Sequence, residues 1–239
     1  MLTCHARHES IGTLPTGFRP PQERFLIKHI ASIRTSGTIM PSSRYLVNRL
    51  LSGIDFTRAR DIVELGVGTG CVTREILRRM RPDARLISLE INPEFVDLAR
   101  RRFLDARLTL RSACASALPL ILAEEGIDRV DAVVSSLPLR IMDQTVVDRI
   151  LDVSRESLRA DGRFHQYQYS LSHYDQLAKR YAAVGVRFTV RNTPPAFVYE
   201  CTGTEGQAPV PVRLKPSVAA VYAGALAAAS MMIRVVQGG

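Results

Sequence analysis

The chain has 239 residues, of which 46% are hydrophobic and 23% charged, and its formal net charge is +9 at pH 7. This composition excludes a largely disordered chain and predicts a globular domain with a sizeable core. The positive charge favours an anionic partner, such as an acidic membrane surface, a charged substrate or nucleic acid. A generally basic surface without such a partner is the alternative.

The cysteines and the terminal segments indicate the cellular compartment and whether a metal is expected. Four cysteines occur without metal-ligand spacing, which predicts reduced thiols in a cytoplasmic protein and no metal site. The first residues lack the apolar core of a signal peptide. The apolar run at 218–233 is shorter than the roughly 20 residues of a membrane span. It predicts a packed helix, with a membrane-associated tail as the alternative.

The N-terminal part is expected to contain a flexible lead-in at 1–21, followed by amphipathic and lid helices at 22–56. The lead-in contains glycines and prolines that disfavour regular structure. Residues 22–35 predict a basic amphipathic helix, because apolar residues recur there at helical spacing between arginines and lysine. A second helix is expected at 41–54, with Ser42 or Ser43 as N-cap and Gly53 as its end.

From residue 57 to 201 the pattern alternates between strands and helices. Strands are expected at 61–66, 84–91, 107–113, 130–138 and 162–170, with two more inside 186–201. Helices are expected at 71–80, 93–104, 117–126, 144–158 and 172–185. The alternation predicts an α/β fold with a mostly parallel sheet, helices on both faces and an antiparallel edge hairpin. Residues 202–239 are expected to form a linker and an apolar tail of unknown role.

A glycine turn follows the first expected strand in the sequence ELGVGTG, at Glu64 to Gly70. Its spacing resembles the first motif of class I S-adenosylmethionine (SAM)-dependent methyltransferases, which implies a Rossmann-like, seven-stranded fold and SAM as cofactor. An acidic residue at the end of the next strand, Glu90, is placed to accept hydrogen bonds from the two ribose hydroxyls. The resemblance implies cofactor contacts for Glu64, Gly66, Gly68, Thr69, Gly70, Glu90 and Ile91.

The third expected strand departs from this class. Many such enzymes use a carboxylate or amide after it to reach the adenine amino group, whereas this chain has RSACAS at 111–116. We expect groups around Ala113 and Cys114, or the Ser112 hydroxyl, to take that place.

The residues at the end of the fourth expected strand indicate which kind of acceptor receives the methyl group. Adenine-N6 methyltransferases have Asn or Asp, two prolines and an aromatic residue there, whereas this chain has Ser135-Ser136-Leu137-Pro138. The amide and the stacking ring are missing, and aromatic residues are 6% of the chain. Nucleic acid is therefore disfavoured as the acceptor.

A larger set of segments resembles one family. SGTIMPSSRYL, ELGVGTG, LEINPEF, VVSSLPL, GRFHQYQYS and NTPPAFVY occur in the order found in bacterial phospholipid N-methyltransferases. Those enzymes convert phosphatidylethanolamine stepwise towards phosphatidylcholine. The resemblance covers residues 24–200 and implies that residues 22–35 bind an anionic membrane surface at the inner face of the membrane.

The resemblance also implies roles for individual residues. Ser42 belongs to the lead-in that closes over SAM, and Ser135 lies on the cofactor side. The acceptor is expected near Ser136, Leu137, Pro138 and Arg140. Tyr45, Tyr167 and Tyr169 are candidates for holding the head-group cation, with ordinary core tyrosines as the alternative. Other acceptors stay open: a small metabolite, or none, in a membrane-binding protein that has lost catalysis.

Overall fold

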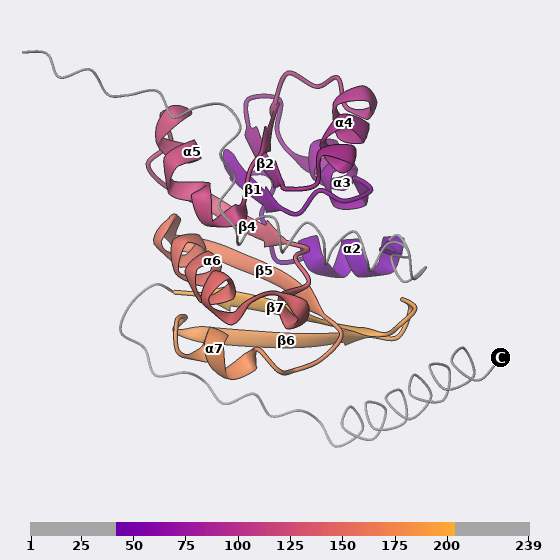
Figure 1. The fold of residues 1–239 in the computed structure, drawn as a ribbon, viewed down its shortest axis with the longest axis vertical. Coiled ribbons are helices and arrows are strands. Elements are labelled where there is room, and N and C mark those ends of the chain that lie inside the picture. Colours follow the sequence, from indigo (N-terminus) through magenta and orange to yellow (C-terminus); the bar gives the residue numbers. More distant parts are fainter. Residues whose placement is uncertain (1–41, 204–239) are drawn as a thin grey trace, which may run out of the picture.

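The computed structural model describes residues 42–203 (Figure 1). The expected lead-in at 1–21, the basic amphipathic helix at 22–35 and the apolar tail after 203 lie outside the described residues. Within 42–203, no helix is long and apolar enough to cross a bilayer.

The described chain alternates between strands and helices. The strands are β1 (Asp61–Leu65), β2 (Arg85–Glu90), β3 (Leu108–Ser112), β4 (Val130–Ser135), β5 (Leu158–Gln168), β6 (Ala183–Thr189) and β7 (Ala196–Thr202). The helices are α2 (Arg44–Leu51), α3 (Cys71–Arg79), α4 (Pro93–Arg102), α5 (Leu118–Glu124), α6 (Gln144–Glu156) and α7 (Tyr174–Ala178). Two short 3-10 turns precede α5 and α6, namely η1 (Ala115–Ala117) and η2 (Leu139–Ile141).

The seven strands form one sheet in the order β3-β2-β1-β4-β5-β7-β6. The first five strands pair in parallel, whereas β7 is antiparallel to both β5 and β6. This confirms the expected mostly parallel sheet with an antiparallel edge hairpin. The chain moves from β1 outward to β3 and then returns to β4 beside β1. Open α/β sheets bind ligands where the strand order reverses in this way, outside the carboxyl ends of the strands.

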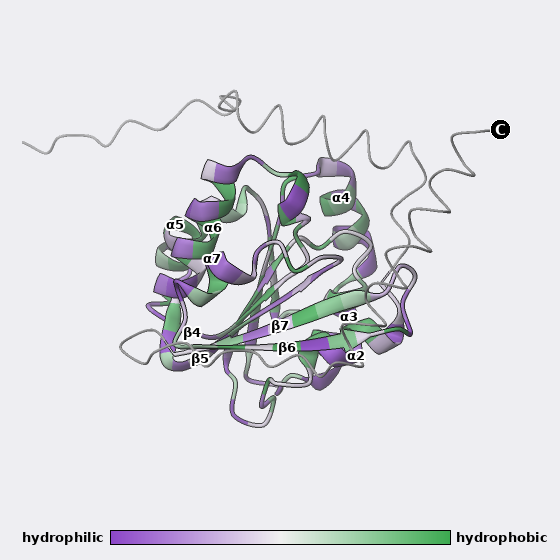
Figure 2. Cartoon of the chain, turned by 90° about the horizontal axis from the view of Figure 1, so that it is seen from below, coloured by the Kyte–Doolittle hydropathy of each residue, from purple (hydrophilic) through white to green (hydrophobic). Residues whose placement is uncertain are grey.

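Helices cover both faces of the sheet, each over its own apolar cluster. In Figures 1 and 2, α2, α3 and α4 lie on one side and α5, α6 and α7 on the other. The first side packs apolar residues of α2 and α3 against β1, β2, β4 and β7. The second packs α5, α6 and α7 against the opposite face. Because strand side chains alternate between faces, a sheet covered twice needs nearly continuous apolar strands. The burial of all five β1 residues fits that requirement.

The last expected helix is shorter than the sequence pattern indicates. We expected helix at 172–185, but α7 ends at Ala178 and β6 begins at Ala183. Residues 183–185 pair with β7, since Ala183 lies opposite Thr202. Tyr181 stacks on Phe164 with ring centroids 5.6 Å apart. Pairing with β7 and this packing override the local helical pattern.

Helix α2 begins as expected but ends earlier. Ser43 is the N-cap, and its hydroxyl accepts a hydrogen bond from the Leu46 amide at 3.2 Å. We expected Gly53 to end the helix, yet it ends at Leu51 with Ser52 as the C-cap. Gly53 instead packs tightly, because a Cβ there would lie 2.5 Å from a carboxylate oxygen of Glu200.

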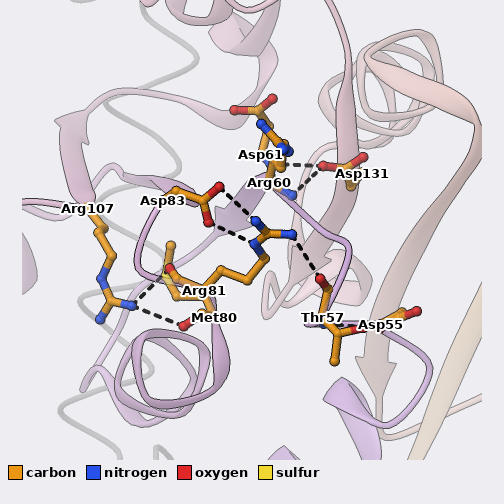
Figure 3. A network of polar contacts seen from close by, with 9 residues as sticks. All are labelled: Asp55, Thr57, Arg60, Asp61, Met80, Arg81, Asp83, Arg107 and Asp131. Carbon is orange, nitrogen blue, oxygen red and sulfur yellow. Dashed lines mark hydrogen bonds and ion pairs between the residues drawn. The ribbon is translucent and has the colours of Figure 1, made fainter.

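The amino ends of the strands are held together by charged groups (Figure 3). The Asp131 carboxylate accepts the backbone amides of Arg60 and Asp61 at 2.7 and 2.9 Å. Asp61 also forms ion pairs with Arg85 and Arg159. These contacts fix the edge of the sheet that lies opposite the glycine turn. The carboxyl ends of β1, β2, β4 and β5, called the carboxyl edge below, are left for ligands.

Candidate functional site

The glycine turn joins β1 to α3 at the carboxyl edge. Gly66, Gly68 and Gly70 have φ angles of 84°, 52° and 77°, which L residues rarely adopt. A Cβ on Gly70 would lie 2.6 Å from the Phe103 ring, and one on Gly66 would lie 3.1 Å from the Leu137 side chain. A Cβ on Gly68 would meet no atom within 4 Å. The turn is therefore packed at its two ends and open at its centre.

Glu90 ends β2 and faces the centre of this turn. Its carboxylate accepts the Gly68 amide at 3.0 Å and the Asn92 amide at 2.8 Å. Burial raises the pKa of Glu90 above its usual value, and the backbone amides of Gly68 and Asn92 oppose the rise. A carboxylate is a strong hydrogen-bond acceptor, so this side chain is suited to ligand hydroxyls at the centre of the turn. The expected position of Glu90 at the end of the strand is borne out by the structure.

Glu64 lies deeper than Glu90, beneath the turn. Its side chain is fully buried and accepts hydroxyl hydrogen bonds from Thr73 at 2.9 Å and Ser88 at 2.7 Å. Burial raises its pKa to about 7, while the Ser88 and Thr73 hydroxyls oppose the rise. Glu64 thus connects β1, β2 and α3, and it supports the turn from below.

We expect Glu64→Gln to flatten the pH dependence of stability. The folded pKa of about 7 exceeds the ordinary 4.5, so between these values only the folded state holds the proton. The unfolding free energy therefore falls by about 3 kcal/mol as pH rises through this window, and the variant lacks that fall. Denaturant titrations from pH 4.5 to 8 measure it. Glu156→Gln, on the exposed side of α6, is the control, and equal slopes in all three proteins would contradict the assignment.

The adenine side lies at the end of β3. The Ala113 amide donates to the Glu90 carbonyl at 3.1 Å, so that donor is already used. Cys114 and Ile91 are both buried, and the Ser116 hydroxyl donates to the Cys114 sulfur at 3.2 Å. Ser112 is exposed at the end of the strand. Among the expected groups, the Ser112 hydroxyl is the one that remains free to meet a base.

The Leu137 backbone occupies the end of β4, where an acceptor is expected. Its carbonyl accepts the side-chain amides of Gln166 at 3.1 Å and Gln168 at 2.9 Å. The same oxygen also accepts the Leu139 backbone amide at 2.9 Å, so its lone pairs are fully used. Ser135 is fully buried, and its hydroxyl accepts the Leu137 amide at 3.4 Å. The Ser136 hydroxyl is buried without a hydrogen-bond partner in the described residues, which leaves it available.

Two tyrosines lie at the carboxyl end of β5, Tyr167 within the strand and Tyr169 just after its last residue, Gln168, although we expected the strand to reach residue 170. Tyr167 and Tyr169 have ring centroids 5.9 Å apart in an edge-to-face arrangement, as their spacing of two predicts. The Ser42 hydroxyl donates to the Tyr167 hydroxyl at 3.3 Å. Burial raises the pKa of Tyr167, and it raises that of Tyr169 to about 12, where an Asn192 hydrogen bond opposes the rise. Both tyrosines stay protonated at neutral pH.

The other two predicted acceptor residues lie further out. Tyr45 is 39% exposed at the start of α2, with Arg44 and Arg191 against its ring. Arg140 lies exposed in η2 and forms no ion pair within residues 42–203. The structure therefore brings Ser42, Tyr167 and Tyr169 together but does not bring Tyr45 or Arg140 into their hydrogen-bond network.

Sequence reasoning missed several residues that hold this edge together. Gln166 and Gln168 bind the Leu137 carbonyl, and Asn192 accepts the Ser43 amide at 3.0 Å. The glutamines alternate with the two tyrosines in QYQY, so they face the other side of β5. Polar residues on the inward face of a buried strand were the available signal.

The described residues contain no group of side chains that could hold a metal ion. The sheet order, the glycine turn and the acidic end of β2 define a class I SAM-dependent methyltransferase, and SAM is its cofactor. The open centre of the turn and the Glu90 carboxylate beside it fit that cofactor. A family model described as a methyltransferase domain matches residues 62–162.

Known proteins place the chain within this class. An ornithine lipid N-methyltransferase from Singulisphaera acidiphila is 33% identical over 183 residues, which make up 76% of this chain and 95% of the relative. The chain belongs to the family of that methyltransferase. A putative O-methyltransferase from Mycobacterium sp. is 28% identical over 134 residues, 48% of this chain and 61% of that protein.

Solved structures share the fold at low identity. An N1-methyltransferase for 1,6-didemethyltoxoflavin from Burkholderia thailandensis has a TM-score of 0.58 and 18% identity, covering 80% of this chain and 94% of that one. An O-methyltransferase from Bacillus cereus in complex with SAH has a TM-score of 0.56 and 14% identity, covering 74% and 90%. At these identities the likeness concerns the fold.

Proposed function

We propose that this chain transfers methyl groups from SAM to the amine of a membrane lipid, either phosphatidylethanolamine and its partly methylated forms or a lipid with an ornithine head group. The observation that carries the proposal is the 33% identity with a lipid N-methyltransferase over 95% of that protein. The segments that resemble phospholipid N-methyltransferases point to the same kind of acceptor.

The glycine turn and Glu90 hold SAM in this proposal. The Glu90 carboxylate binds the ribose hydroxyls, and the open space above Gly68 receives the cofactor backbone. Thr69 belongs to the same turn, while Ile91 and Ser112 lie on the adenine side. SAM supplies an activated methyl group on a sulfonium, and the chain has to align the amine with it.

The acceptor lies against Ser136, Leu137 and Tyr167. The Leu137 carbonyl already accepts three hydrogen bonds, whereas the Ser136 hydroxyl has no partner within residues 42–203, so that hydroxyl and the tyrosine hydroxyls bind the amine in this proposal. The raised pKa values of Tyr167 and Tyr169 keep them neutral, and burial lowers the pKa of His165 to about 3. None of them is a base of suitable strength at neutral pH. The amine therefore loses its proton to water before it binds.

Membrane contact is part of the same proposal. Residues 22–35, which lie outside the described range, are proposed to bind an anionic surface at the inner face of the membrane. The enzyme would then meet lipid head groups at the surface of the bilayer.

The test is transfer of labelled methyl from SAM to vesicles. One set contains phosphatidylethanolamine with an anionic lipid, a second contains an ornithine-headed lipid, and a third contains only phosphatidylcholine and the anionic lipid as control. We expect label in the organic phase of one or both amine-containing sets, separable by head group, and none in the control. SAM binding without label in any lipid would overturn the lipid acceptor and favour a small-molecule amine.

A further inference from the structure

Two arginines from distant parts of the chain meet on one tyrosine. The guanidinium carbon of Arg44 lies 4.9 Å from the Tyr45 ring centroid, and that of Arg191 lies 5.0 Å from it. Arg44 also donates to the Tyr45 hydroxyl at 2.9 Å. All three side chains are exposed. Neither arginine forms an ion pair with a carboxylate anywhere in residues 42–203.

Other arginines of the antiparallel part of the sheet do pair with a carboxylate. Arg163 on β5 and Arg187 on β6, the two strands that flank β7, both form ion pairs with Glu200. Two cations held on one ring without a carboxylate repel each other, and a bound anion relieves that repulsion. Guanidinium groups bind phosphate and carboxylate oxygens through two hydrogen bonds each. The charge and the geometry of the Arg44–Tyr45–Arg191 cluster therefore suit an oxyanion.

The cluster is fixed to the acceptor side by a short chain of contacts. The Ser43 hydroxyl donates to the Arg191 carbonyl at 2.7 Å, and the Ser43 amide donates to the Asn192 side chain at 3.0 Å. The preceding residue, Ser42, contacts the Tyr167 hydroxyl. Ser43 is thus the only residue in the sequence between Arg44 and Ser42, whose side chain contacts the tyrosine pair. The amine and the anion of one head group can be bound by neighbouring residues.

Exposed apolar side chains surround the cluster. Val190, next to Arg191, is 61% exposed, Tyr169 is 44% exposed and Tyr45 is 39% exposed. Large apolar side chains beside unpaired arginines suit the interface of a bilayer, where acyl chains and charged head groups meet. A free phosphate ion in water would not call for these apolar neighbours.

We propose that Arg44 and Arg191, held on Tyr45, bind the anionic group of the acceptor lipid's head group and so position its amine at the carboxyl edge. The inference rests on the proposed lipid acceptor. The anion is a phosphodiester if the acceptor is phosphatidylethanolamine and a carboxylate if it is an amino-acid head group. Arg44 and Arg191 are positioning residues for the methyl transfer.

The test compares two double variants of equal net charge. Arg44→Gln with Arg191→Gln removes the cluster, and Arg129→Gln with Arg149→Gln removes two exposed arginines elsewhere. Substrate is presented in neutral phosphatidylcholine vesicles, which suppresses general charge attraction. We expect the KM for the amine lipid to rise at least tenfold in the first variant, with kcat within twofold and SAM affinity unchanged. The control pair keeps the wild-type KM.

Further arms identify the anion and separate the proposal from its premise. The KM rise of the Arg44 and Arg191 double variant is compared between the two amine lipids. A larger rise with phosphatidylethanolamine indicates that a phosphodiester is bound, and a larger rise with the ornithine-headed lipid indicates a carboxylate. Equal KM changes in both double variants would overturn the proposal. Lysine at both positions should restore part of the affinity, and unchanged SAM affinity shows that the glutamine double variant folds.

Vesicle sedimentation needs no methyl transfer, so it remains informative if the proposed acceptor is wrong. Binding to vesicles with and without the amine lipid is compared at constant salt. The cluster variant should lose the amine-lipid-dependent part of binding, whereas the Arg129 and Arg149 pair should keep it. Wild-type vesicle binding without any lipid methylation would refute the proposed function alone. Equal binding by both double variants would refute the cluster's role.

Discussion

Replacing Gly68 with alanine should abolish most SAM binding while the fold persists. A Cβ at this position meets no protein atom within 4 Å, so it projects into the space above the glycine turn. The positive φ of 52° adds about 1–2 kcal/mol of backbone strain, which the domain tolerates. The methyl group would occupy the volume that the cofactor needs. We expect SAM affinity to fall at least tenfold, and Gly68→Val to be more severe; titration calorimetry measures both.

Gly126 offers a matched control. It also has a positive φ, 66°, and a Cβ on it also meets nothing within 4 Å, but it lies in the turn after α5. Gly126→Ala should lose a similar amount of stability in a denaturant titration and keep wild-type SAM affinity. If both variants lost affinity equally, the backbone strain would be responsible and the glycine turn would not be the cofactor site.

Replacing Glu90 with alanine should weaken SAM binding by about 100-fold. The change removes the proposed acceptor for two ribose hydroxyls, and hydrogen bonds to a charged group contribute about 1.5–3 kcal/mol each. It also frees the amides of Gly68 and Asn92, which loosens the turn. Glu90→Gln keeps one acceptor oxygen and should lie between alanine and wild type. Burial raises the pKa of Glu90, so its carboxylate gains a proton at a higher pH than an exposed glutamate does. As the pH is lowered, the affinity of the wild type for SAM should therefore begin to fall at that higher pH.

Asp131 is the corresponding control. Its carboxylate also accepts two backbone amides, at the amino ends of the strands and therefore away from the glycine turn. Asp131→Ala should reduce the unfolding free energy without changing SAM affinity. A loss of affinity as large as that of Glu90→Ala would mean that both act through stability, and the role of Glu90 in binding the ribose would be wrong.

The sheet could be predicted from the sequence because its signals are local. Apolar runs such as IVEL, which begins at Ile62, and LISLE, which ends at Glu90, alternate with helical patterns, and the glycine turn marks the first crossing from strand to helix. The exception was the segment at 179–185, where alanines favour a helix. Its residues 183–185 are instead the start of β6, because they pair with β7, whose residues lie later in the chain.

The candidate site could be predicted only in part. The cofactor side follows one continuous motif and the end of the next strand, so Glu90 and the three glycines could be found by spacing. The acceptor side is built from Ser42 and Ser43, the β5 residues and Asn192, whose contacts span up to 149 positions. No local sequence pattern predicts that the Asn192 side chain accepts a hydrogen bond from the Ser43 amide. A lipid acceptor was indicated by the resemblance to a known family. The identity of its head group depends on side chains that local sequence patterns do not distinguish.

The tie between Ser43 and residues 191–192 also orders events during synthesis. The glycine turn, Glu90 and their supporting strands are complete once residues up to about the end of β4 have left the ribosome. Among the described elements helix α2 emerges first, yet its anchor arrives almost 150 residues later. A nascent chain can thus assemble the glycine turn and Glu90 well before Ser42 and Ser43 reach their partners, because contacts between distant residues form late.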